Sequence, residues 1–242
     1  MDAAQRLEAL RAVIAAIAGN GPNLSPDVPV ETCPGWTVED VVDHLGRVHL
    51  WARQATLGTT RPHLGPREMS DGQTLGEWYA ACGKQLLERL SGADVTEECW
   101  TFDRQDRTVG FWVRRQLHES TIHWADLAHA HGVEAEITPE VADDGIDELL
   151  HLFVPNRISD PARALPLPLA IRATDTGSVW CVQEDDGQVV ATRGEEGEVV
   201  GEIRSGAVEL YLALWGRAPR SSLLVVGEGA PARAFLAEQL VP

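Results

Sequence analysis

The first half of the chain repeats apolar residues at the three- and four-residue spacing of amphipathic helices. This spacing predicts helices over residues 2–18, 38–56, 74–91 and 108–130. Thr37 and Asp40 have the spacing of a capping box with a shorter acid, which marks the start of the second helix. Four amphipathic helices of this length are typical of a four-helix bundle.

The pattern changes in the second half. Short β-like runs predict strands at 167–173, 178–183, 189–193 and 223–226, and two helices are predicted at 205–215 and 230–240. Asp185-Asp186-Gly187 predicts a hairpin turn. Residues 155–168 contain four prolines and indicate a domain linker or a first edge strand. We therefore expect an α+β protein of two domains, with a helical bundle over residues 1–152 and a small α+β domain over 153–242.

Charge and composition narrow the function classes. Lys and Arg total 20 against 37 Asp and Glu, a formal net charge of −17, which argues against nucleic-acid and anionic membrane partners. No stretch is long and apolar enough to predict a membrane span, and the N-terminal segment lacks the cationic start of a signal peptide. The four cysteines are scattered, which predicts free thiols in a reducing compartment. These features predict a cytoplasmic globular protein.

Candidate chemistry first appears on the helix predicted at 108–130. Glu119 and His123 are four residues apart and are therefore neighbours on one helix face. A carboxylate and an imidazole at this spacing can bind one divalent ion together. The alternative is a solvated face on which both are ordinary surface residues.

His44 lies within the apolar stripe of the helix predicted at 38–56, between Val41 and Leu45. A histidine in such a stripe is either a core histidine with its hydrogen bonds satisfied or a ligand. Together with Glu119 and His123 it would supply two imidazoles and one carboxylate. Three protein ligands leave one coordination position open, which is the arrangement of catalytic rather than structural metal sites.

Three segments, Cys33–Leu45, Arg114–Asp126 and Leu210–Arg217, resemble the mycothiol-dependent maleylpyruvate isomerase family. The resemblance covers nearly the whole chain in the right order. It implies a DinB-like four-helix bundle followed by a smaller α/β domain. It also implies that His44, Glu119 and His123 are metal ligands, that the metal is zinc, and that mycothiol is the thiol cofactor or co-substrate.

The resemblance also assigns an arginine near the active site. Arg217 matches an arginine that the family contributes from the second domain, and it would bind a substrate carboxylate. The alternative is that Arg217 only bonds the last carbonyls of the helix ending at Gly216. Asp126 and Arg115 are candidate cofactor-binding residues. Asp126 could orient a ligand or hold the polar part of the thiol, or form a helix-end salt bridge, and Arg115 could instead form an ion pair along the helix.

These features predict an enzyme in which a divalent metal binds a low-molecular-weight thiol as its thiolate, which then attacks an electrophilic small molecule. The reaction would be an isomerisation or an S-transfer. The alternative is a non-catalytic binding or regulatory member of the same fold. Cys33 is predicted to be a buried structural thiol, and Trp36 and Trp112 to lie in the core or line a pocket. The remaining histidines are expected at the surface: His49, His63, His118, His129, His131 and His151.

Overall fold

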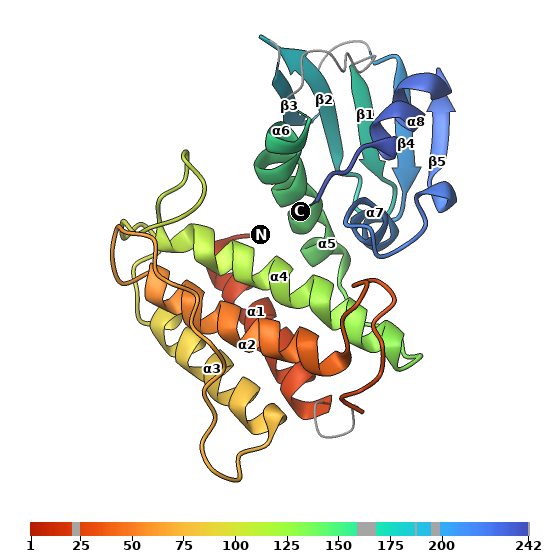
Figure 1. Ribbon diagram of the computed structural model, residues 1–242. Helices are drawn as coiled ribbons and strands as arrows, with labels where there is room; N and C mark the ends of the chain where they lie inside the picture. The colour runs from red at the N-terminus through yellow and green to blue at the C-terminus, as the bar shows by residue number, and fades with distance from the viewer. Residues whose placement is uncertain (21–24, 159–167, 187, 195–198, 242) are drawn as a thin grey trace. The chain divides into compact units, whose positions relative to one another are not determined.

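The computed structural model describes residues 1–20, 25–158, 168–186, 188–194 and 199–241. The chain folds as two compact units, Met1–Glu136 and Ile137–Pro242. The first is helical and the second combines helices with a five-stranded sheet, so the predicted two-domain α+β fold is confirmed (Figure 1). Within the described ranges, none of the helices combines the length and apolar character needed to cross a membrane.

Four helices form the first unit, and each lies within two residues of its predicted range. They are α1 (Ala3–Asn20), α2 (Val38–Ala55), α3 (Leu75–Ser91) and α4 (Val109–Ala130). The expected capping box at Thr37 is present, because its side chain accepts from the Asp40 amide while the Asp40 carboxylate accepts from the Thr37 amide. Thr74 and Glu77 make the same reciprocal pair at the start of α3. These caps fix where α2 and α3 begin.

Helix α4 supplies much of the core of the first unit. It packs against both α1 and α2, and buried residues occur on all its faces, including Trp112 and Leu117. Helices α2 and α3 approach closely at Gly46, where a Cβ atom would lie 2.4 Å from the Trp78 ring. Any larger residue at Gly46 would therefore displace that ring. This close packing fixes α2 beside α3. Helix α2 also packs against α4, and α2 and α4 carry the candidate site.

The second unit is built on a sheet with strand order β3-β2-β1-β4-β5. Strands β1 and β4 are parallel, and the other neighbours are antiparallel. The strands are β1 (Leu169–Ala173), β2 (Val179–Asp185), β3 (Gln188–Arg193), β4 (Gly201–Ser205) and β5 (Leu224–Gly227). The helical elements are α5 (Pro139–Glu148), a π-helical turn (Leu149–Phe153), α6 (Val154–Arg157), α7 (Ala207–Leu214), a 3₁₀ turn (Arg220–Ser222) and α8 (Gly229–Ala237).

The strand and helix predictions in this unit are largely confirmed, but strand β4 and the helical segments between residues 139 and 157 were not predicted. Strand β4 was not predicted, because only Ile203 is a large apolar residue in its five positions and the strand is held by pairing on both sides. Helix α5 was not predicted either. Asp186 has the left-handed φ of 48° expected of a turn, whereas Gly187 of the predicted hairpin and residues 159–167 of the predicted linker or strand lie outside the described residues.

The boundary between the units differs from the one expected at 152/153. Helix α5 belongs to the second unit, where it packs against α7. Two carboxylates on α5 are bound by residues of the sheet: Asp143 accepts from Thr176 and Arg193, and the Trp180 indole donates to Asp147. These contacts are made between residues about 30 to 50 positions apart, so no local composition signal marks the boundary.

Candidate metal centre

Helices α2 and α4 bring together the three residues predicted as metal ligands. His44 lies on α2, and Glu119 and His123 lie one turn apart on α4. Oε1 of Glu119 is 2.8 Å from Nε2 of His44 and 3.7 Å from Nε2 of His123. One potential ligand atom from each residue lies within 4.8 Å of the other two. The predicted triad therefore converges on one point.

The geometry and chemistry of this triad fit a divalent cation. Zinc–ligand bonds of about 2.0–2.2 Å place the ligand atoms of a tetrahedral site roughly 3.4 Å apart, within the spread of the distances found here. Two imidazole nitrogens and one carboxylate oxygen form a donor set that zinc accepts. The side chains of His44, Glu119 and His123 are 30%, 23% and 11% exposed, so solvent reaches one side of the triad.

Glu119 is held as an anion between cationic and hydrogen-bonding groups. Burial would raise the pKa of its carboxyl. The hydrogen bond from His44 and the charge of Arg115 act in the opposite direction and hold that pKa well below its ordinary value. Nη2 of Arg115 lies 3.2 Å from Oε2 of Glu119. Arg115 is itself buried, and its contact with Glu119 matches the ion-pair alternative. Because Arg115 binds Oε2, the other oxygen of Glu119, Oε1, faces the histidines.

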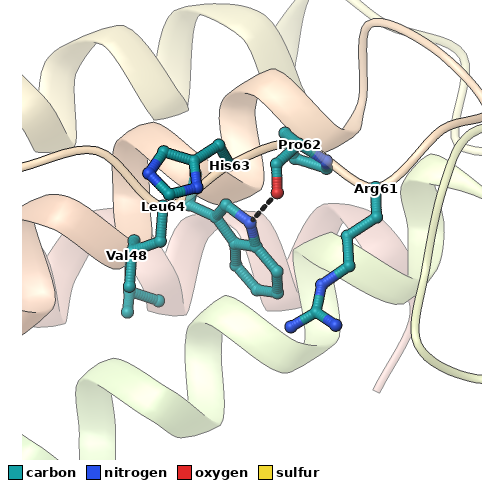
Figure 2. A pocket seen from close by; sticks show the side chains of 6 residues that line it. Val48, Arg61, Pro62, His63 and Leu64 are labelled. Carbon is teal, nitrogen blue, oxygen red and sulfur yellow. Dashed lines mark hydrogen bonds between the residues drawn. The ribbon is translucent and has the colours of Figure 1, made fainter.

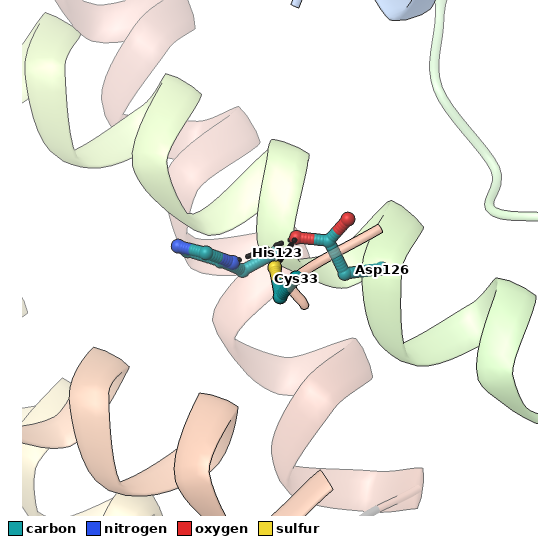
Figure 3. A group of neighbouring side chains, drawn as sticks. All are labelled: Cys33, His123 and Asp126. Atoms are coloured by element: carbon teal, nitrogen blue, oxygen red, sulfur yellow. Dashed lines mark hydrogen bonds and ion pairs between the residues drawn. The ribbon is translucent and has the colours of Figure 1, made fainter. Parts of the chain in front are cut away.

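Asp126 is fully buried and contacts the far side of the His123 ring (Figure 3). Its Oδ2 is 2.8 Å from Nδ1 of His123 and accepts from the Cys33 thiol at 3.2 Å, while Oδ1 accepts from the Thr32 hydroxyl at 2.5 Å. When Nδ1–H donates to this carboxylate, the lone pair of Nε2 faces Glu119. The geometry thus supports the alternative in which Asp126 orients a ligand.

Sequence reasoning missed the contribution of the loop before α2. Thr32 and Cys33 lie in this loop, which is tied by an isolated pairing between Pro29 and Thr37. Cys33 is partly exposed rather than buried, and it forms a second potential ligand group with His123 and Asp126. No local sequence signal marks Thr32, because its partner lies 94 residues away on α4.

Trp36 lines the site, which was one of its two predicted positions. Its ring stacks on His123 with centroids 6.2 Å apart and planes 15° apart, and it lies 5.1 Å from the His44 ring. Trp112 is in the core, with its indole donating to the Trp100 carbonyl. Trp36 therefore shields the two imidazoles on one side.

Two histidines expected at the surface are fully buried, His49 and His118. Nδ1 of His49 lies 2.8 Å from Oε1 of Gln116, and its Nε2 lies 3.3 Å from the Tyr79 hydroxyl. Burial lowers the pKa of His49 to about 4, although the Gln116 hydrogen bond opposes this shift. The helical spacing contained the missing signal, because His49 follows the buried Leu45 by four residues.

The other four histidines are less buried. His63, His129 and His151 are exposed, and His131 is half-buried. Nδ1 of His131 lies 2.9 Å from the Leu127 carbonyl oxygen, one helical turn earlier. None of these four belongs to either potential ligand group in the described part of the chain.

Arg217 lies in the second unit, just after the end of α7. Gly216 takes the left-handed φ of 76° there, and the Arg217 amide donates to the Leu212 carbonyl at 2.7 Å. Nη1 of Arg217 donates to the Trp215 carbonyl at 2.9 Å. These contacts match the helix-end alternative for this arginine.

Comparisons with known proteins identify the family. A family model described as the mycothiol maleylpyruvate isomerase N-terminal domain matches residues 4–128. Two similar solved structures are a mycothiol-dependent maleylpyruvate isomerase (12% identity, TM-score 0.59) and a histidine-to-alanine mutant described by the same name (10% identity, TM-score 0.58). Each comparison covers 93% of both chains and shows a shared fold. No curated protein sequence matches the chain. Because the family model spans more than half of its length, this chain belongs to the mycothiol maleylpyruvate isomerase family.

Proposed function

We propose that this protein is a metal-dependent enzyme that uses a low-molecular-weight thiol, mycothiol, to attack an electrophilic small molecule. The observation that carries the proposal is the convergence of His44, Glu119 and His123 on one partly exposed point. Membership of a family described by mycothiol and maleylpyruvate isomerase supports the choice of thiol and of reaction class.

Nε2 of His44, Oε1 of Glu119 and Nε2 of His123 would hold the metal, with zinc as the best match to this donor set. When bound, a divalent cation lowers the pKa of a coordinated thiol, so that the thiolate is available at neutral pH. The thiolate sulfur would form a bond to one carbon of an activated double bond, whose π electrons move onto the adjacent carbonyl group as that bond breaks. In an isomerisation, rotation about the resulting single bond is followed by loss of the thiolate, which restores the double bond. In a transfer the C–S bond remains, and the carbanion takes up the proton that the thiol lost.

The chain's own residues prepare the site for this chemistry. Arg115 fixes the Glu119 carboxylate, and Asp126 fixes the ring of His123, so that both present one atom to the same point. Trp36 excludes water from one side of the imidazoles. The exposed fractions of His44 and Glu119 leave another side open for a thiol and its acceptor.

Arg217 is proposed to bind a substrate carboxylate through its planar guanidinium. Arg217→Lys tests this role, because an ammonium group cannot reproduce a two-point contact. We expect a lower turnover with a carboxylate-bearing substrate and saturating thiol. If Arg217 only caps α7, turnover stays at the wild-type value while the melting temperature falls.

The proposal is tested on protein purified without chelator. We expect about one zinc ion per chain by elemental analysis. With an electrophile panel we expect mycothiol-dependent turnover, seen as consumption of the thiol in a transfer or as isomerisation of an unsaturated acid with the thiol regenerated. The same protein stripped of metal should show neither. A chain that binds metal and thiol without turnover would favour the non-catalytic binding member. A chain that binds no divalent ion would overturn the metal-dependent mechanism.

A further inference from the structure

A cavity of about 500 Å³ lies beside α2 in the first unit, and none of the triad residues lines it (Figure 2). It is lined by Val48 and Trp51 of α2 and by Arg61, Pro62, His63 and Leu64 of the following loop. Its volume is within the range of small-molecule sites. The walls formed by Val48, Trp51 and Leu64 are apolar, so the cavity suits a hydrocarbon group.

The Trp51 wall is held in place from three sides. Its indole Nε1 donates to the Pro62 carbonyl at 3.0 Å, which ties the loop to α2. Its ring also packs edge-to-face against Trp100 and Trp112, with centroids 5.4 and 5.2 Å away. A flat ligand placed on this ring would therefore meet a preformed surface.

Arg61 supplies an uncompensated positive charge at this cavity. Its guanidinium lies 5.8 Å from the centre of the Trp100 ring, and within the described ranges it has no carboxylate partner. The neighbouring Arg47 and Arg67 are paired, with Asp43 and with Glu39 respectively. In a chain with a net charge of −17, an arginine left without an acid beside an apolar cavity is complementary to an anionic ligand.

Two residues that line the cavity lie on the same face of α2 as His44. Val48 and Trp51 follow His44 by four and seven residues, a spacing that places all three on the same side of α2. Four residues of α-helix rise about 6 Å. A small ligand that fills the cavity can therefore extend toward the triad.

We propose that this cavity binds a carboxylic acid with a flat apolar body, with the carboxylate on Arg61 and the body against Trp51 and Val48. Its assignment as the site of the electrophilic substrate rests on the proposed function and is an alternative to carboxylate binding by Arg217. Cinnamate, an unsaturated aryl acid, is a suitable probe, and cinnamamide has the same shape without the charge.

The first test is isothermal titration of metal-free protein with both probes. We expect cinnamate to bind about tenfold more tightly than cinnamamide, and Arg61→Gln to remove this difference. Lys84→Gln is the matched control, because it removes one positive charge from an exposed side chain on α3. Equal affinity for acid and amide, an unchanged cinnamate affinity in Arg61→Gln, or no binding up to about 10 mM would overturn the proposal.

The second test asks whether the bound acid lies near the triad. In protein loaded with Co²⁺, we expect faster nuclear relaxation of the cinnamate protons than in metal-free protein, and no such difference in Arg61→Gln. Binding without enhanced relaxation would overturn the substrate assignment. If cinnamate binds but the chain takes up no metal, the proposed function fails while the carboxylate site stands, so the two failures are distinguishable.

Discussion

Two histidines on the same helix, five residues apart, have opposite environments. His44 is partly exposed and lies 2.8 Å from the Glu119 carboxylate, with a second imidazole beside it. His49 is fully buried, and its hydrogen-bond partners are neutral, the amide of Gln116 and the hydroxyl of Tyr79. The residue type is the same, so the difference comes from the charge of the partner and the access of water.

The comparison shows what separates a ligand site from a structural contact. Burial disfavours the charged imidazole more than the Gln116 hydrogen bond and the charge of Glu119 favour it, so His49 stays neutral and serves the packing between α2, α3 and α4. His44 faces a carboxylate and remains open to solvent on one side. A cation at His44 is accessible from solvent, and the Glu119 carboxylate balances its charge. A cation at His49 would instead break two hydrogen bonds in the interior.

The largest expected effect is loss of the metal from the triad that contains His44. His123→Ala removes one of three ligands, and we expect loss of stoichiometric metal and of mycothiol-dependent turnover. Elemental analysis and activity measure the loss, and thermal unfolding of metal-free protein should match that of wild type. If His123→Ala unfolded the protein as severely as a core truncation, the site would be structural rather than catalytic.

Truncation of a core side chain should lower the stability of the protein and leave its metal binding intact. Leu45 is fully buried between the two histidines on α2, and Leu45→Ala should lower the free energy of unfolding by roughly 2–5 kcal/mol. Denaturant unfolding measures this change. At temperatures where the variant is folded, it should still bind stoichiometric metal, and Leu117→Ala on α4 should behave in the same way.

The buried histidine predicts a pH dependence of stability. The pKa of His49 is about 4 in the folded protein against 6.5 as its ordinary value, so the unfolded chain binds more protons between these values. The stability associated with neutral His49 is therefore full above pH 6.5 and is lost as the pH falls toward 4, by at most about 3 kcal/mol. Unfolding of metal-free wild type and His49→Gln across this range isolates the contribution, and identical slopes would contradict it.

The smallest expected effect concerns the support of His123. Asp126→Asn keeps the size of the side chain but removes the charge that accepts from Nδ1 of His123. Loss of such a partner typically weakens metal affinity by about 10–100-fold. Competition with a chelator of known affinity measures this change, and Asp143→Asn in the second unit is the matched control. An unchanged affinity in Asp126→Asn would show that His123 is held in place without it.

Much of the first unit could be predicted because its signals are local. Periodicity gave the ranges of α1 to α4, and the spacing of Glu119 and His123 placed them on one face. The buried position of His49 was also encoded in this spacing but was not predicted. In the second unit, β4 and α5 were missed because their stability comes from pairing and packing with distant segments rather than from their own composition.

The sequence by itself determined helices α1 to α4, the cap of α2 and the adjacent Glu119–His123 pair, because each depends on local spacing along the chain. Only the tertiary structure decided that His44 meets Glu119 across 75 residues, and that Thr32 and Cys33 bind Asp126. It also decided that Arg61 lines a cavity with Val48 and Trp51, on the helix of His44. These contacts depend on how α2 packs against α4 and on the paths of the loops flanking α2, which no local spacing specifies.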